Sequence, residues 1–104
     1  MSFLYLIIAI VAEVIATSAM KASDGFSQLS ASIITVIGYA VAIYFLSLTM
    51  KTIPVGITYA LWSGAGIILV SLVGFFYYKQ HLDLAAIIGL AFMIIGILII
   101  HLFS

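Results

Sequence analysis

One acidic side chain lies in the middle of a long apolar run near the start of the chain. Glu13 follows Phe3 within this run, and the helical rise of about 1.5 Å per residue places its carboxyl group about 15 Å from the start of the run. A hydrocarbon core is about 30 Å thick, so this depth is close to the centre of a bilayer. Because acids at such a depth are costly and usually face a cavity or a partner, Glu13 is the main candidate for function.

The apolar runs supply no Lys or Arg side chain that could pair with Glu13. Without a fixed cation the carboxylate should take up a proton, because loss of water disfavours its charged form. An arriving cation can ionise the group again, so Glu13 is suited to exchanging protons for a cation at one site. The alternative interpretation is a neutral Glu13 that only joins helices through hydrogen bonds to Thr17 or to a tyrosine.

Side chains three and four positions away share the helical face of Glu13. Several of them are small, which leaves room for a bound molecule beside the carboxylate. Small residues serve close helix packing equally well, so both interpretations stay open. The residues on this face are Leu6, Ala9, Ala16, Thr17 and Met20.

Aromatic residues in the second and third apolar runs could complete a site for a lipophilic cation. Tyr59, Trp62, Ser63 and Gly66 share one helical face, and Tyr39 lies midway along the second run. Aromatic faces attract cations and cover flat organic groups. Membrane aromatics also serve as interfacial anchors, but Trp62 would lie about 10 Å inside its run, which favours the site for this residue.

Two pairs of glycines suggest further roles. Gly64 and Gly66 lower the local stability of the third run and permit a bend, so they are candidate hinge residues, with tight packing as the competing interpretation. Gly89 and Gly96 lie seven positions apart on one helical face of the fourth run. Such small-residue seams are typical of helix association, so we expect a dimer contact there.

Four runs in the chain are long and apolar enough to cross a membrane, which takes about 20 residues in a helix. They do not alternate every second residue, as the strands of a membrane barrel would. We therefore expect an all-α integral membrane protein with one four-helix domain over residues 1–104 and short connections. The expected spans are 3–20, 33–50, 55–78 and 84–103.

The composition excludes several classes of function. Hydrophobic residues make up 67% of the chain and charged residues 6%, against roughly 25% charged residues in soluble domains. A formal net charge of zero leaves no basic surface for nucleic acid, and the lack of cysteine excludes thiolate chemistry. His81 and His101 lie at the ends of runs without a ligand set, so we expect no metal, no cofactor and no enzyme.

The charges flanking the runs give only a weak signal for orientation. Lys21 and Lys79 would lie on one side of the membrane and Lys51 on the other, a near balance that suggests insertion in both orientations. Because four helices with one acid can barely enclose an organic cation, a dimer with two Glu13 side chains is more plausible. Dual insertion would make this homodimer antiparallel, with the symmetry that transporters obtain from inverted repeats.

Conserved order and spacing of short motifs over nearly the whole chain also resemble the small multidrug resistance family, closest to its quaternary-ammonium exporters. This resemblance implies an antiparallel homodimer in the inner cell membrane that exchanges protons for aromatic and quaternary ammonium cations. It implies that Glu13 binds both proton and substrate, that Tyr59, Trp62 and Tyr39 line the site, and that Gly89 and Gly96 form the dimer contact. The motifs are Ala12-Glu13-Val14-Ile15-Ala16-Thr17, Met20-Lys21, Gly25-Phe26, Ile53-Pro54, Tyr59-Ala60-Leu61-Trp62-Ser63-Gly64-Ala65-Gly66 and Leu82-Asp83-Leu84.

Departures from the family pattern leave the substrate range open. Phe3, Ala16, Ala42 and Ile43 stand where relatives have Tyr, Gly, Ser and Phe. A guanidinium or polyamine exporter of the same fold is therefore an alternative, although the guanidinium branch tends to place Trp at the position of Ala16. A non-transporting structural subunit and a rotor-ring proteolipid are further alternatives, the latter disfavoured by the central aromatic residues.

Overall fold

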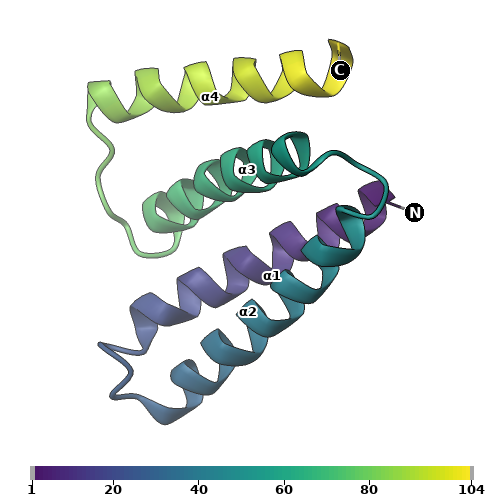
Figure 1. The fold of residues 1–104 in the computed structure, drawn as a ribbon. Coiled ribbons are helices and arrows are strands. Elements are labelled where there is room, and N and C mark those ends of the chain that lie inside the picture. Colours follow the sequence, from purple (N-terminus) through teal and green to yellow (C-terminus); the bar gives the residue numbers. More distant parts are fainter. Residues whose placement is uncertain (1, 104) are drawn as a thin grey trace.

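A computed structural model describes residues 2–103 of the chain. Within this range the chain forms four helices: α1 (Ser2–Ala22), α2 (Leu29–Thr49), α3 (Val55–Phe76) and α4 (Leu84–Phe103). The helices α1 and α2 run side by side as a hairpin, α3 lies on the other side of α1, and α4 lies beyond α3 (Figure 1). Each helix is long and apolar enough to cross a membrane. The expected all-α class with four spanning helices is confirmed.

Five helix ends differ from the expected spans by one to four residues, because hydrophobic runs do not define where hydrogen bonding ends. α1 covers 2–22 rather than 3–20, and α2 ends at Thr49 rather than at Met50. α2 begins at Leu29 rather than at Ile33, and the hydroxyl of Ser32 donates to the carbonyl oxygen of Gln28 at 2.6 Å. A serine that bonds to its own helix in this way is compatible with the helix while interrupting the apolar run. α3 ends at Phe76 rather than at Tyr78.

The most extensive helix contact joins α1 and α2. Leu6 and Ala9 of α1 pack against Leu46 of α2 and Leu61 of α3, and these four residues form the buried core. Dispersion forces and close fit must hold this core together, because lipid offers an apolar side chain nearly the same environment as the protein interior. The core therefore fixes how α1 is rotated between its two neighbours.

Two buried threonines of α2 find hydrogen-bond partners within the backbone of their own helix. The hydroxyl groups of Thr35 and Thr49 donate to the carbonyl oxygens of Ala31 and Phe45, at 2.8 and 2.9 Å. An unpaired hydroxyl would cost several kcal/mol in hydrocarbon. These buried threonines are thereby accommodated, which leaves the Glu13 region as the place where polar groups from different helices meet.

The turn between α1 and α2 is shaped by residues with left-handed backbone conformations. Asp24, Gly25 and Phe26 have φ angles of 50°, 69° and 67°. Ser23 holds the turn through its hydroxyl, which donates to the carbonyl oxygen of Met20 at 2.6 Å and accepts from the amide of Phe26 at 3.1 Å. The reversal is tight enough for α1 and α2 to pack along their lengths.

The fourth helix is the outlying element of the chain. It is linked to the rest mainly through α3, with one aromatic edge contact between Phe3 of α1 and His101 of α4 at a ring-centroid distance of 5.5 Å. Within the part of the chain that the structure describes, no residue of α4 is fully buried. Its free faces must be covered by lipid or by another protein surface.

A hydrogen bond joins the segment that directly follows α3 to α1. The hydroxyl of Tyr78 donates to the carbonyl oxygen of Ser18 at 2.6 Å. The neighbouring Tyr77 is 76% exposed, and no hydrogen bond of its hydroxyl group is recorded among the described residues.

We expect Tyr78→Phe to lower the free energy of unfolding by about 1 kcal/mol, the usual net value of one intramolecular hydrogen bond. Tyr77→Phe is the matched control and should change it by less than about 0.3 kcal/mol, because surface substitutions without partners have small effects. Both are measured by denaturant unfolding in detergent micelles, followed by circular dichroism. Equal stability of the two variants would show that the Tyr78 contact contributes nothing.

Candidate functional site

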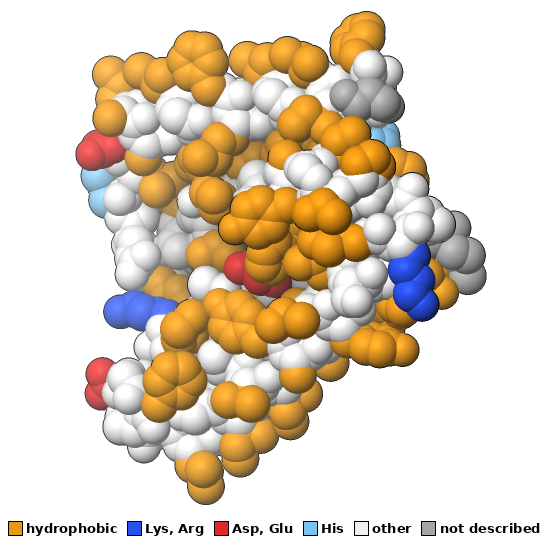
Figure 2. Space-filling view, in the orientation of Figure 1, with side chains coloured by type: hydrophobic (Ala, Val, Ile, Leu, Met, Phe, Trp, Pro, Cys, Tyr) orange, Lys and Arg blue, Asp and Glu red, His pale blue; other side chains and the backbone are white. Residues whose placement is uncertain are grey.

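The carboxylate of Glu13 lies in a pocket between α1 and α3. The pocket has a volume of about 250 Å³ and is lined by Glu13, Tyr59, Trp62, Ser63 and Ile67. In the space-filling view, acidic atoms lie at the centre of one face, surrounded by hydrophobic side chains (Figure 2). The other two acids of the chain, Asp24 and Asp83, lie outside the helices. An ionisable group thus faces a small pocket at the level of the membrane interior.

One oxygen of the Glu13 carboxylate is held by a hydroxyl group from its own helix. Thr17 donates to Oε1 of Glu13 at 2.8 Å, and the hydroxyl groups of Thr17 and Tyr39 lie 2.5 Å apart. Thr17 has a single hydroxyl hydrogen, so while it donates to Glu13, Tyr39 must donate to Thr17. The hydrogen bonds therefore run in one direction, from Tyr39 on α2 through Thr17 to the carboxylate.

The second carboxylate oxygen is buried and lacks a hydrogen-bond partner among the described residues. It lies against Gly66 of α3, where an added Cβ atom would come within 2.6 Å of Oε2. Real Cβ contacts do not reach such a distance, so any other residue at position 66 would displace the carboxylate. The two oxygens of Glu13 are therefore unequal: Oε1 is satisfied and Oε2 is available.

Aromatic rings form the wall of the pocket opposite Glu13. Tyr59 and Trp62 lie with ring centroids 5.8 Å apart at an interplanar angle of 45°. The indole nitrogen of Trp62 is buried and has no partner within residues 2–103, whereas Tyr59 is more than half exposed. The pocket thus combines an unpaired donor, an unpaired acceptor and two aromatic faces.

The structure brings together most of the site residues that the sequence predicts. Some of them have a different position from the one expected. Tyr59, Trp62 and Ser63 line the pocket with Glu13, while Thr17 and Tyr39 reach Glu13 through hydrogen bonds. Ala9 lies fully buried in the core and is not among the residues that line the pocket.

The two glycines expected to act as a hinge have packing roles in this structure. α3 is continuous through both of them. A Cβ atom on Gly64 would lie 2.8 Å from Cδ1 of Ile97 on α4, and Gly66 adjoins Glu13. Bending at these positions therefore remains a prediction, while their role in close contacts is directly visible.

Ile67 is a pocket residue that the sequence reasoning missed. It follows Ser63 by four positions and so shares its helical face. This spacing could have identified it, but an aliphatic residue within an apolar helix carries no chemical signal of its own. Its contribution is apolar surface beside the aromatic rings.

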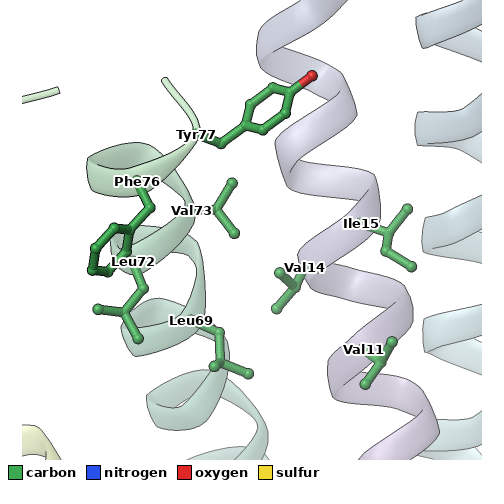
Figure 3. A pocket seen from close by; sticks show the side chains of 8 residues that line it. All are labelled: Val11, Val14, Ile15, Leu69, Leu72, Val73, Phe76 and Tyr77. Atoms are coloured by element: carbon green, nitrogen blue, oxygen red, sulfur yellow. The ribbon is translucent and has the colours of Figure 1, made fainter. Parts of the chain in front are cut away.

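A second, larger depression between α1 and α3 differs sharply in chemistry from the Glu13 pocket. It measures about 380 Å³, and apart from the hydroxyl of Tyr77 its lining side chains are hydrocarbon. In Figure 3, Val14, Leu69 and Val73 lie in the space between the two helices, whereas Phe76 and Ile15 lie on the outer sides of α3 and α1 in this view. The groove offers no counter-charge to a cation, so the Glu13 pocket is the candidate functional site. The lining residues are Val11, Val14, Ile15, Leu69, Leu72, Val73, Phe76 and Tyr77.

The geometry of the Glu13 pocket fits a switch between two kinds of occupant. A proton on Oε2 would neutralise the carboxylate. An organic cation could replace this proton by offering its own charge to the carboxylate and its flat or alkyl surface to the aromatic rings. Because one carboxylate provides one negative charge, the two occupants compete.

Comparisons with known proteins agree with this site. The model of the family described as Small Multidrug Resistance protein matches residues 1–101. The chain is 52% identical over 103 residues to multidrug transporter PA4990 of Pseudomonas aeruginosa, covering 99% of this chain and 94% of that protein. It is 48% identical over 102 residues to multidrug transporter EmrE of Escherichia coli, covering 98% and 93%.

A third relative carries a substrate class in its name. Quaternary ammonium compound-resistance protein QacE of Escherichia coli is 45% identical over 102 residues, covering 98% of this chain and 93% of that protein. The family expected from the motifs is thus confirmed over nearly the whole length, as is a location in the cell membrane. The chain therefore belongs to the Small Multidrug Resistance family of transporters.

Proposed function

We propose that this protein exports lipophilic aromatic and quaternary ammonium cations in exchange for protons. The observation that carries the proposal is the Glu13 carboxylate, whose Oε2 atom faces Gly66 without a partner beside the pocket of Tyr59 and Trp62. Family membership and the names of the relatives support the direction of transport and the class of substrate. No other acid lies within the helices, so no second carboxyl group of the same chain can take part in the exchange.

Exchange follows from competition at one carboxylate. Protonated Glu13 releases its proton when a cation binds, and the cation leaves when a proton returns from the acidic side of the membrane. Each proton moved down the gradient supplies about 1.4 kcal/mol per pH unit. The membrane potential adds about 2.3 kcal/mol per 100 mV for each net charge moved.

A second copy of the chain completes the site in this proposal. A pocket of about 250 Å³ is at the small end for ligand pockets, which measure about 300–1,000 Å³, and Tyr59 is exposed at its edge. An antiparallel partner would supply a second Glu13 and a second pair of aromatic rings. The contact expected at Gly89 and Gly96 of α4 is accessible, since a Cβ atom on either would meet no described atom within 4 Å.

We expect Glu13→Gln to abolish uphill transport in liposomes with an imposed pH gradient, because an amide can neither release a proton nor balance a cation. The assay offers an aromatic dication, a quaternary ammonium compound and guanidinium in turn. Asp24→Asn is the matched control, since Asp24 is an exposed acid in the turn after α1 with a φ of 50° that Asn tolerates well.

The outcomes of this assay separate the alternatives. Transport of guanidinium alone would assign the protein to a guanidinium-exporting branch. A Glu13→Gln variant that assembles differently while the unchanged protein transports none of the three would indicate a structural subunit. Uphill transport by Glu13→Gln at the rate of the Asp24→Asn control would contradict the proposal.

We expect Gly66→Ala to weaken quaternary ammonium binding by at least about 10-fold, the equivalent of one displaced charged contact, because the new Cβ atom must push Oε2 away. Gly56→Ala is the control: it lies on the same helix, and its Cβ atom would meet no described atom within 4 Å. Binding is measured by calorimetry in detergent. An affinity of Gly66→Ala equal to that of Gly56→Ala would refute the role given to this contact.

The chain contains no cysteine, which allows a direct test of the antiparallel dimer by cross-linking. Because Gly89 and Gly96 lie on either side of the middle of α4, antiparallel α4 helices should bring Gly89 of one copy near Gly96 of the other. We expect a mixture of Gly89→Cys and Gly96→Cys chains to form disulfide-linked dimers on oxidation, since such bonds require Cα atoms within about 7 Å.

Each variant oxidised alone should cross-link far less than the mixture. The reverse pattern, with strong cross-links in Gly96→Cys alone, would indicate parallel chains. A Gly56→Cys variant on α3 reports the background of random collisions.

A further inference from the structure

We infer that Gly38 and Ala16 form a close-packed pair that positions the Tyr39–Thr17–Glu13 hydrogen bonds. Ala16 is fully buried on α1, and Gly38 lies opposite it on α2. This inference rests on the proposed function, because it concerns how the binding carboxylate is held. It assigns a positioning role to two residues that have no polar side-chain atoms.

The backbones of α1 and α2 approach each other closely where Gly38 meets Ala16. A Cβ atom on Gly38 would lie 2.8 Å from Cβ of Ala16, 3.2 Å from its Cα and 3.2 Å from the carbonyl oxygen of Ala12. Two of these three neighbours are backbone atoms, which cannot move aside as a flexible side chain would. Carbon atoms pack at about 3.5–4.0 Å, so a methyl group at position 38 would force α2 away from α1.

This crossing point is next to the polar contact in both helices. Tyr39 follows Gly38, Thr17 follows Ala16, and their hydroxyl groups lie 2.5 Å apart. Hydrogen bonds between hydroxyl groups weaken beyond about 3.0 Å, so separation of the helices by about half an ångström would stretch this contact to that limit, and a larger separation would break it. Thr17 would then be free to turn away from Oε1 of Glu13, which it now holds at 2.8 Å.

The intrinsic helix propensities of glycine and alanine separate a backbone effect of Gly38→Ala from a packing effect, because the two effects have opposite signs. Glycine inside a helix is less favourable than alanine, so Gly38→Ala would stabilise the helix if position 38 had room. A loss of function on this substitution therefore points to the contact with Ala16. Adding Ala16→Gly on α1 should reverse the loss of function, because removing the methyl group of Ala16 eliminates the 2.8 Å clash with the new Cβ atom at position 38.

The test uses four chains: the unchanged protein, Gly38→Ala, Ala16→Gly and the double variant Ala16→Gly/Gly38→Ala. We expect Gly38→Ala to weaken quaternary ammonium binding by about 10-fold, the value of one hydrogen bond to a charged group. The double variant should recover to within about 3-fold of the unchanged protein, because space lost on α2 is returned on α1. Binding of Gly38→Ala at the unchanged affinity, or a double variant no better than Gly38→Ala, would overturn the inference.

A second double-mutant cycle, made with Tyr39→Phe, distinguishes a positioning role of Gly38 from a general loss of structure. If Gly38 acts through Tyr39, then Gly38→Ala should weaken binding by less than about 2-fold when Tyr39 is already replaced by Phe, since coupled residues are not additive. A full loss in the Tyr39→Phe background would show that the pair does not act through this hydroxyl group. Tyr44→Phe, a change on an exposed side chain of α2, is the matched control.

A measurement without substrate keeps this inference separate from the proposed function. The methyl signal of Thr17 in nuclear magnetic resonance spectra should shift in both Gly38→Ala and Tyr39→Phe. In the double variant Ala16→Gly/Gly38→Ala it should return toward its position in the unchanged protein. These results would support the positioning pair even if the protein bound no quaternary ammonium compound. An unmoved Thr17 signal in Gly38→Ala would contradict it whatever the substrate.

Discussion

A single carboxyl group without a fixed cation, held where water is scarce, is the constraint on which the rest of this structure depends. Glu13 lies within a membrane-spanning helix, where an uncompensated charge is costly. The surrounding residues do not neutralise it. They satisfy Oε1 through Thr17 and leave Oε2 against Gly66 without a partner, so the carboxylate is oriented but still able to bind.

Three of the four helices contribute to the surroundings of Glu13. α1 carries the acid and packs against both α2 and α3, while α4 adjoins α3. α2 contributes a hydroxyl group through Tyr39, and α3 contributes the aromatic wall and a glycine that leaves space. The exposed outer helix α4 contributes nothing to the pocket within one chain, which agrees with the role in dimerisation proposed for its glycines.

Small residues have a specific function in this membrane protein because close approach of helices takes the place of the hydrophobic effect. Gly64 accommodates Ile97 of α4, Gly66 accommodates the carboxylate, and Gly38 accommodates Ala16. In each case a methyl group would touch an atom from another helix. The contact of Gly64 lies between α3 and α4, that of Gly66 between α3 and α1, and that of Gly38 between α2 and α1.

Run length and helical spacing within one segment are sufficient to predict the four spans, the acid at mid-membrane depth and the face of α3 with Tyr59 and Trp62. The packed helices were needed to show that Ala9 is core, that Thr17 links Tyr39 to Glu13 and that Gly66 adjoins Oε2. Such contacts depend on how far each helix is rotated and how closely it crosses its neighbour. Periodicity along one helix carries no information about either quantity, so two small residues such as Ala9 and Ala16 look alike in sequence while one packs in the core cluster and the other lies in close contact with Gly38 of α2.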